Sequence, residues 1–244
     1  MSLASELNIS TTGRDSPAFP FIPLQRSVLV LLGGFGALAA FVTVMPAPTR
    51  AERSVDRVLH ATRGSAMFGL GRAVSFIGSA WFVAAASVLV AAFVWTVMRR
   101  RRLAVLCLAG PALAGVGEIV MKNFVGRTRL TTRLLTGASG YGFPSGHTAG
   151  AAALAVVLVI VASFLISNAR THRLIVGAAV LYAVAVGISR VVVGAHYALD
   201  VVGGWLFGAA VALIAFFVIT SRSGSELSRD GARALLPDDG SQSC

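Results

Sequence analysis

The stretch Gly140-Tyr141-Gly142-Phe143-Pro144-Ser145-Gly146-His147 is a polar, glycine-rich turn that interrupts a sequence of long apolar runs. Glycine permits positive φ and close backbone approach, so several N–H groups could converge on one anion. The glycines concerned are Gly137, Gly140, Gly142 and Gly146. Ser145 suits the N-cap of a helix whose positive end would face the turn, and His147 would lie in its first turn, where an imidazole can give or take a proton. Taken alone, the stretch fits a phosphate-binding loop and an ordinary capped loop equally well.

The composition is that of a membrane protein. Hydrophobic residues make up 56% of the 244 positions and charged residues only 13%, against about 25% charged in soluble domains. The net charge of +11 does not indicate a nucleic-acid partner, because the basic residues lie in short loops and form no stripe interleaved with aromatic residues. Anionic lipid headgroups are the expected partner. Cys107 and Cys244 are too few for a disulfide framework or a metal site.

Six apolar runs predict an all-α polytopic membrane protein, a bundle of six transmembrane helices. The runs are Ser27–Val44, Val74–Met98, Leu103–Val125, Thr148–Ile166, Leu174–Val193 and Leu199–Thr220. The predicted segments are a polar tail at 1–26, a membrane domain at 27–220 and a second polar tail at 221–244. The first run exceeds the 7–15-residue core of a signal peptide and follows a long polar lead, which favours a retained helix over a cleaved signal. Residues Ala51–Arg63 could form a short amphipathic helix at the membrane interface, and Gly204 and Gly208 would let another helix approach the last span closely.

The placement of Lys and Arg predicts how the bundle crosses the membrane. Six spans put both tails on one side. Arg99–Arg102 and the pair Arg170 and Arg173 occupy very short loops on that side, where the positive-inside rule is strongest. We therefore expect a plasma-membrane protein with both termini in the cytoplasm and the turn at Gly140–His147 on the extracytoplasmic face.

Two other stretches reach the same face as the glycine-rich turn in this arrangement. One leaves the third span from Lys122 onward, and the other runs from Ser189-Arg190 to His196 and Asp200 at the start of the sixth span. His196 and Asp200 are four residues apart, so on a helix the carboxylate can reach the imidazole, fix its tautomer and leave the other nitrogen as a nucleophile or base. Two His, an Asp, several cations and a glycine-rich turn on one face would equip phosphoryl transfer without a metal.

Other charged residues have plainer interpretations. An isolated basic residue at the end of a span more often snorkels to lipid headgroups, and this applies to Lys122, Arg127, Arg129 and Arg133 taken singly. Glu118 lies inside a span four residues before Lys122, so we expect it to be the ion-pair partner of that lysine. His60 and His172 are expected to be solvated loop residues.

The three stretches resemble the signature of the type 2 phosphatidic acid phosphatases, or lipid phosphate phosphatases, which share their site with vanadium haloperoxidases. That signature reads K-x6-R-P, then P-S-G-H, then S-R-x5-H-x3-D. The matching residues are Lys122 through Arg129, Pro144-Ser145-Gly146-His147, and Ser189-Arg190 followed by His196 and Asp200. The six-helix layout extends the resemblance to about residues 27–220. Leu130 stands where the family has Pro, which bears on the pose of Arg129 but removes no functional group.

The resemblance implies a role for each matching residue. His196 would be the nucleophile that forms a phosphohistidine, Asp200 would orient it, and His147 would be the general acid for the leaving alcohol. The implied phosphate-binding residues are Lys122, Arg129, Ser145, Gly146 and Arg190, with no metal and no other cofactor. The substrate would be a lipid phosphate or diphosphate at the outer headgroup level, such as phosphatidate, phosphatidylglycerol phosphate or polyprenyl diphosphate.

Two alternatives remain open at this point. A lipid phosphotransferase would use the same residues and pass the phosphoryl group to an acceptor other than water. A six-helix transporter of anions or lipids could use the same cations as a filter, although transporters usually bind their substrate near the midplane and His196 and Asp200 are expected at one membrane face. The hydrophobic spans exclude a soluble haloperoxidase.

Overall fold

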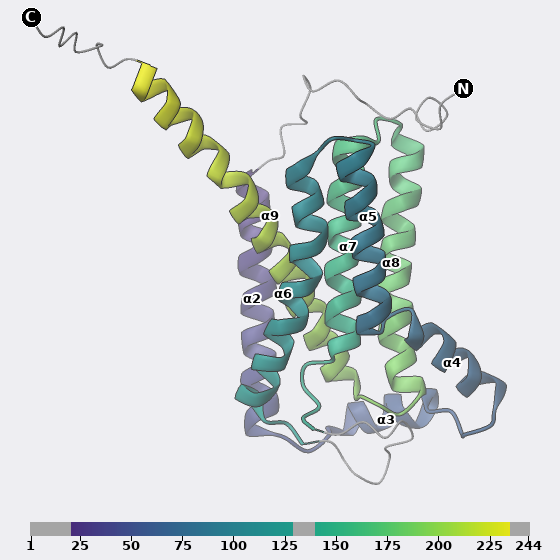
Figure 1. The fold of residues 1–244 in the computed structure, drawn as a ribbon. Coiled ribbons are helices and arrows are strands. Elements are labelled where there is room, and N and C mark those ends of the chain that lie inside the picture. Colours follow the sequence, from purple (N-terminus) through teal and green to yellow (C-terminus); the bar gives the residue numbers. More distant parts are fainter. Residues whose placement is uncertain (1–20, 129–139, 235–244) are drawn as a thin grey trace, which may run out of the picture.

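The computed structural model describes residues 21–128 and 140–234 as a helical bundle (Figure 1). The helices are α2 (Phe21–Val44), α3 (Arg50–Leu59), α4 (Ala66–Phe76), α5 (Ala80–Thr96), α6 (Arg101–Val125), α7 (Gly146–Leu165), α8 (Ala169–Val192) and α9 (Ala198–Ala234). Helices α2, α6, α7, α8 and α9 are each long and apolar enough to cross a membrane, and α4 with α5 makes a sixth span if this bent pair is taken together. The predicted all-α, multi-pass fold is confirmed.

Helix α7 lies at the centre of the bundle and packs against α5, α6, α8 and α9. Of its apolar span 67% is buried inside the protein, compared with 11% for α2 and 44% for α6, α8 and α9. Close packing with α9 requires glycine: a Cβ on Gly208 would lie 2.1 Å from the carbonyl oxygen of Ala149, and one on Gly204 would lie 2.7 Å from that of Ser145. The expected close approach at Gly204 and Gly208 is therefore confirmed. It brings the start of α9 beside the start of α7.

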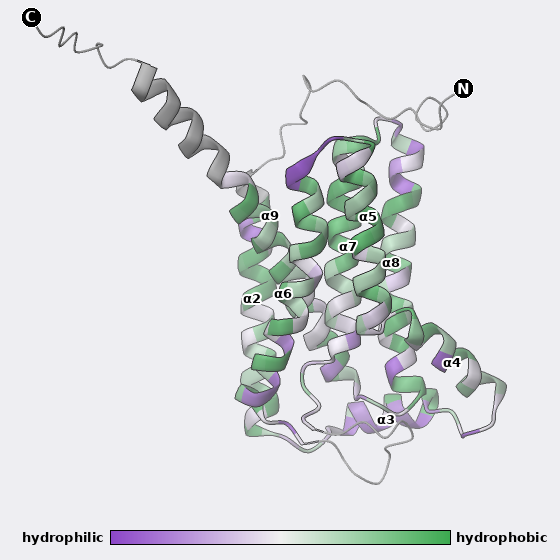
Figure 2. Ribbon diagram, in the orientation of Figure 1, coloured by the Kyte–Doolittle hydropathy of each residue, from purple (hydrophilic) through white to green (hydrophobic). Residues whose placement is uncertain are grey.

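The bundle is apolar along its middle and polar at its two ends (Figure 2). Large apolar side chains such as Leu29, Trp81 and Phe124 point outward and are mostly exposed. In a soluble protein so much exposed apolar surface would be unfavourable, whereas lipid chains solvate it. The outer surface therefore fits a position in a bilayer.

The predicted spans differ from the helices mainly at their ends. Helix α2 begins at Phe21, and α9 continues to Ala234, so helix extends into both segments predicted as polar tails. Helix α8 begins at Ala169, five residues before the predicted span, because the side chain of Asn168 accepts hydrogen bonds from two N–H groups of the first turn. Hydropathy marks the apolar part of a helix, whereas caps and propensity decide where the helix ends.

The predicted second span, Val74–Met98, is broken into α4 and α5 with a bend of 44°. The break occurs at Ile77-Gly78-Ser79, where the Ser79 hydroxyl caps α5 by accepting from Phe82 N–H at 3.3 Å. Gly78 packs so tightly against α8 that a Cβ would lie 2.3 Å from Val186. A local cap and one tight helix contact explain a bend that an apolar run does not reveal.

Helix α3 lies across the end of the bundle (Figure 1). It begins with a capping box, in which Thr49 and Glu52 each accept the other's N–H. The short helix predicted within Ala51–Arg63 is therefore confirmed, but the faces are reversed from an ordinary amphipathic helix. Its carboxylates, Glu52 and Asp56, are buried in the protein, whereas Val58 is 79% exposed.

The two histidines outside the motifs are less solvated than predicted. The His172 ring nitrogen Nε2 lies 2.9 Å from the Ser163 hydroxyl, so this side chain bridges α8 and α7. His60 follows α3 and is half-buried, with its N–H bonded to the Asp56 carbonyl. His172 was predicted to lie in a loop and to be solvated, but it lies in α8 with a side-chain partner, and His60 is only partly exposed.

Candidate active site

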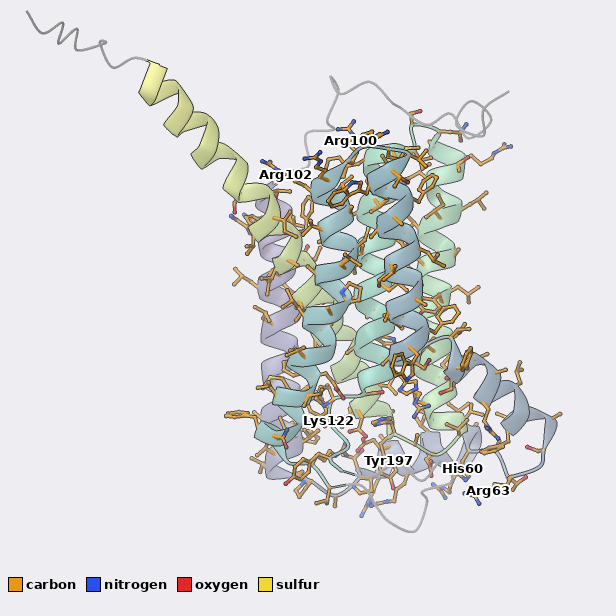
Figure 3. All side chains as sticks on the ribbon, viewed as in Figure 1. His60, Arg63, Arg100, Arg102, Lys122 and Tyr197 are labelled. Atoms are coloured by element: carbon orange, nitrogen blue, oxygen red, sulfur yellow. The ribbon has the colours of Figure 1, made fainter. Side chains whose placement is uncertain are left out.

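The described motif residues gather at the end of the bundle where α3 and α4 lie. Lys122 and Tyr197 are at this end, and so are His60 and Arg63, whereas Arg100 and Arg102 are at the opposite end (Figure 3). Helices α2 and α9 also have their outer ends, at Phe21 and Ala234, away from the motif end (Figure 1).

The glycine-rich turn is fastened to the segment that leaves α6. Thr128 and Tyr141 form an antiparallel bridge, and Gly142 N–H donates to the Arg127 carbonyl at 2.7 Å. Of the described glycines in this turn, Gly140 has positive φ, at +84°. Phe143 fixes the turn to the bundle, because its side chain is fully buried and stacks on Phe35 with ring centroids 5.7 Å apart. The first motif segment and the turn are thus one packed unit.

Ser145 and Gly146 join the turn to α7. Ser145 occupies the predicted N-cap position, but its side chain makes no capping bond to the helix. Its N–H donates to the Asp200 carbonyl at 2.9 Å, and its Oγ accepts from the Thr148 hydroxyl at 3.0 Å. Gly146 faces α6, where a Cβ would lie 2.6 Å from a carboxylate oxygen of Glu118. A larger residue at position 146 would therefore have to displace the Glu118 carboxylate.

Lys122 forms an ion pair with Glu118 one turn earlier on α6, as predicted. Glu118 is buried and the Lys122 side chain is partly exposed. Lys122 is therefore paired with one carboxylate, and part of its side chain remains accessible.

His196 and Asp200 contact each other, with the imidazole Nδ1 3.5 Å from the carboxylate Oδ2. Both are buried. The contact is not made along one helix face as expected, because α9 begins only at Ala198. Instead Asp200 sits in the first turn of α9 and accepts the N–H of Tyr197, which precedes the helix, at 3.1 Å. That bond directs one carboxylate oxygen back toward His196 and leaves the imidazole Nε2 as the nitrogen away from Asp200.

Arg127 is a site residue that the sequence did not reveal. We expected a cation contacting headgroups, but Arg127 is only 2% exposed. Its Nη1 donates to Asp200 Oδ1 at 2.6 Å, and its Nη2 donates to the two carboxylate oxygens of Glu52 at 3.1 and 3.0 Å. Burial alone would lower the pKa of Arg127, but the neighbouring carboxylates of Asp200 and Glu52 outweigh it and raise the pKa, so the guanidinium stays charged. No sequence signal pairs Arg127 with a glutamate 75 positions away.

Two cavities meet at His147. The first has a volume of about 650 Å³ and is lined by His147 and three arginines, Arg63, Arg72 and Arg190. Arg190 is buried and donates to the Ser75 hydroxyl of α4. The second is a mostly apolar cavity of about 610 Å³ between α5 and α6, and it also reaches Lys122. A cationic cavity and an apolar one thus share one histidine.

The structure brings most of the predicted site residues into one region. The residues it places there are Lys122, Ser145, Gly146, His147, Arg190, His196 and Asp200. Arg129, Arg133, Leu130 and Gly137 lie outside the described residues. Within residues 21–128 and 140–234, no three His, Cys, Asp or Glu side chains cluster in a way that would hold a metal ion.

Comparison with known proteins agrees with this geometry. Residues 103–223 match the model of the PAP2 superfamily. Phosphatidylglycerophosphatase B of Bacillus subtilis (strain 168) is 35% identical over 104 residues, which cover 41% of this chain and 48% of the relative. The chain therefore aligns with about half the length of this curated relative.

Two solved structures share the fold. A crystal structure described as the first transmembrane PAP2 type phosphatidylglycerolphosphate phosphatase from Bacillus subtilis superposes with a TM-score of 0.69 at 23% identity, covering 82% of this chain and 96% of that one. The crystal structure of Aquifex aeolicus LpxE superposes with a TM-score of 0.52 at 24% identity, covering 67% and 93%. Lys122 lies in α6, Ser145 and His147 lie at the start of α7, and the third motif runs from the end of α8 to the first turn of α9. With these motifs and the matching region at residues 103–223, the chain belongs to the PAP2 superfamily.

Proposed function

We propose that this protein is an integral-membrane phosphatase that removes phosphate from a lipid phosphate or diphosphate through a phosphohistidine. The observation that carries the proposal is the buried contact between His196 and Asp200, beside the turn that holds Ser145 and His147. A histidine oriented by a carboxylate on one ring nitrogen is suited to attack with the other. The names of the Bacillus relatives support a lipid phosphate as substrate.

The proposed reaction has two steps. In the first, His196 Nε2 attacks phosphorus, a P–N bond forms and the P–O bond to the lipid breaks, while His147 gives its proton to the leaving oxygen. In the second, water attacks the phosphohistidine, His147 takes a proton from that water, and the P–N bond breaks to release inorganic phosphate and free His196. Asp200 holds the His196 tautomer and stabilises the positive charge that attack places on the ring.

The phosphate would be held by cations and backbone N–H groups. Arg190 lines the cationic cavity with His147, and Lys122 approaches from α6. Gly146 N–H lies at the positive end of α7, where an anion is favoured. Arg129 is assigned to the same role by its place in the motif. Together these groups would offset the charge on the transferring phosphoryl oxygens.

The apolar cavity between α5 and α6 is suited to the lipid tail. Its lining includes Val83 and Val88 of α5 and Val116 and Ile119 of α6, and its polar end reaches Lys122 and His147. A lipid lying there would have its tail among apolar side chains and its phosphate beside the proposed general acid. The lipid substrate would then enter the cavity directly from the bilayer and would not have to be extracted into water first.

We further propose that the reaction takes place on the extracytoplasmic face of the plasma membrane. Arg100 and Arg102, which belong to the short basic loop, lie at the end opposite Lys122 and Tyr197 (Figure 3). Short basic loops remain cytoplasmic. With those arginines inside, the motif end faces outward and both termini are cytoplasmic.

The test is phosphate release by the purified protein in detergent from a panel containing phosphatidate, phosphatidylglycerol phosphate and a polyprenyl diphosphate, with EDTA present. We expect release from at least one lipid, with acid-labile phosphate on wild-type protein and none on His196→Ala. Loss of activity with EDTA would contradict the metal-independent mechanism. Phosphate appearing on an added alcohol instead of in solution would identify a phosphotransferase, and binding without turnover would favour a transporter.

A further inference from the structure

Glu52 and Arg127 form a buried chain of charges behind Asp200. Glu52 reaches Arg127 with both carboxylate oxygens, Arg127 reaches Asp200 at 2.6 Å, and Asp200 lies 3.5 Å from His196. All four residues are buried, with exposures between 2% and 6%. Burying a charged side chain is costly unless it is paired with an opposite charge in good geometry. The pairing therefore holds this row of charged side chains in one arrangement.

Arg127 is fixed from three sides. Its Nη2 meets Glu52, its Nη1 meets Asp200, and its Nε donates to the carbonyl of Pro46 at 3.2 Å. The guanidinium also lies over the ring of Tyr197, 5.8 Å from its centroid. A planar group held at each nitrogen cannot rotate, and the Asp200 oxygen bonded to it is held with it.

We propose that Glu52 is a positioning residue for the reaction: it fixes Arg127, Arg127 fixes the Asp200 carboxylate, and Asp200 sets the orientation of His196. This inference rests on the proposed phosphatase function. Within residues 21–128 and 140–234, Glu52 forms hydrogen bonds with Thr49, Arg127 and the N–H of Leu199. These partners include none of the described groups assigned to phosphate binding, so Glu52 acts through other residues.

The charge of Glu52 has a second consequence. Arg127 alone beside Asp200 would neutralise the carboxylate that supports His196. With Glu52 added, the two carboxylates and one guanidinium carry a net negative charge next to the imidazole. Attack by Nε2 makes the ring cationic, and a neighbouring net negative charge stabilises that state. Helix α3 would thus contribute to the chemistry although it carries none of the motif residues.

The experiment compares Glu52→Gln with wild type in steady-state phosphate release and in inhibition by inorganic phosphate, which is bound without the bond to His196. Glutamine keeps the size of the side chain but removes its charge. We expect kcat to fall about 10- to 100-fold, the range found when a carboxylate that orients a metal-binding histidine is removed, while KM and the phosphate inhibition constant stay within about twofold. Glu52→Asp keeps the charge and should recover most of kcat.

Asp56→Asn is the matched control. Asp56 lies one turn further along α3, is as buried as Glu52, and is not among the partners of Arg127. It should retain kcat. An equal loss of kcat in Asp56→Asn would assign the effect to α3 as a whole and overturn the proposal. Wild-type kcat in folded Glu52→Gln, or a parallel rise in KM and in the phosphate inhibition constant, would overturn it as well.

If Glu52→Gln does not fold, Arg127→Lys decides the question. Lysine keeps the positive charge but has no fork to reach two carboxylates at once. We expect lower kcat with unchanged KM, and wild-type kcat would overturn the proposal. A wild-type protein inactive on every lipid tested would instead refute the proposed function, so the two failures are distinguishable.

Discussion

Replacing Gly208 with alanine tests whether the packing of α9 on α7 holds the site together. A Cβ at this position would lie 2.1 Å from the carbonyl oxygen of Ala149, a backbone atom that cannot rotate away. Real Cβ atoms keep at least 3.0 Å from such neighbours, so moving from 2.1 to 3.0 Å separates the helices by roughly 0.9 Å. Overpacking of this kind destabilises a protein by about 1–3 kcal/mol.

The displacement would reach the site because it acts between the two helices that carry it. Asp200 lies in the first turn of α9, two turns before Gly208, and its carbonyl accepts Ser145 N–H at the start of α7. A misplacement of about 1 Å at a reacting centre can lower the rate ~100-fold. We therefore expect Gly208→Ala to lower kcat about 100-fold and to lower the midpoint of thermal unfolding.

The assay is phosphate release in detergent, with a thermal unfolding curve for each variant. Gly177→Ala on α8 is the control, because a Cβ there meets nothing within 4 Å. Alanine is also favoured over glycine inside a helix by about 1 kcal/mol. The control should keep the wild-type rate and a midpoint at least as high. A folded Gly208→Ala variant with a rate within about twofold of wild type would refute the idea that this contact sets the site geometry.

Three other predictions follow from the proposed site. Asp200→Asn should leave the protein folded and lower the rate by about 10⁴-fold, as mis-set tautomers do in catalytic triads; a near-normal rate would exclude an orienting role. Arg190→Gln should weaken vanadate inhibition along with turnover, since vanadate resembles the five-coordinate phosphoryl state, and unchanged vanadate affinity would move the phosphate site elsewhere. A Ser139→Cys variant should react with an impermeant thiol reagent in intact cells while native Cys244 reacts only after lysis, and the reverse pattern would invert the topology.

The membrane spans and the contact between His196 and Asp200 could be predicted because both are local in sequence. An apolar run of about 20 residues has few alternatives in a bilayer. A spacing of four brings two side chains together near a helix start, even though His196 lies before α9 and not on it. Glu118 and Lys122 were correctly paired by the same spacing.

The break between α4 and α5 and the buried role of Arg127 could not be predicted for the opposite reason. The break depends on Gly78 packing against Val186, more than 100 residues away. The role of Arg127 depends on its contact with Glu52 in α3. In this helix the apolar Val58 is exposed and the Glu52 carboxylate is buried, which is the reverse of the usual amphipathic pattern. Hydropathy assigns such a carboxylate to solvent, and only its distant partner explains why it is buried.

The carboxylate partners separate two kinds of basic residue at this end of the bundle. Among the residues that the structure describes, Arg127 has two carboxylate partners and its side chain is 2% exposed, whereas Lys122 has one and its side chain is 23% exposed. A phosphate that drew Arg127 away would leave two buried carboxylates without a counterion, and breaking a buried pair is strongly unfavourable. A phosphate that approached Lys122 would have to compete only with Glu118, at a partly solvated position. By this reasoning Lys122 is available to substrate, whereas Arg127 belongs to the framework that holds Asp200.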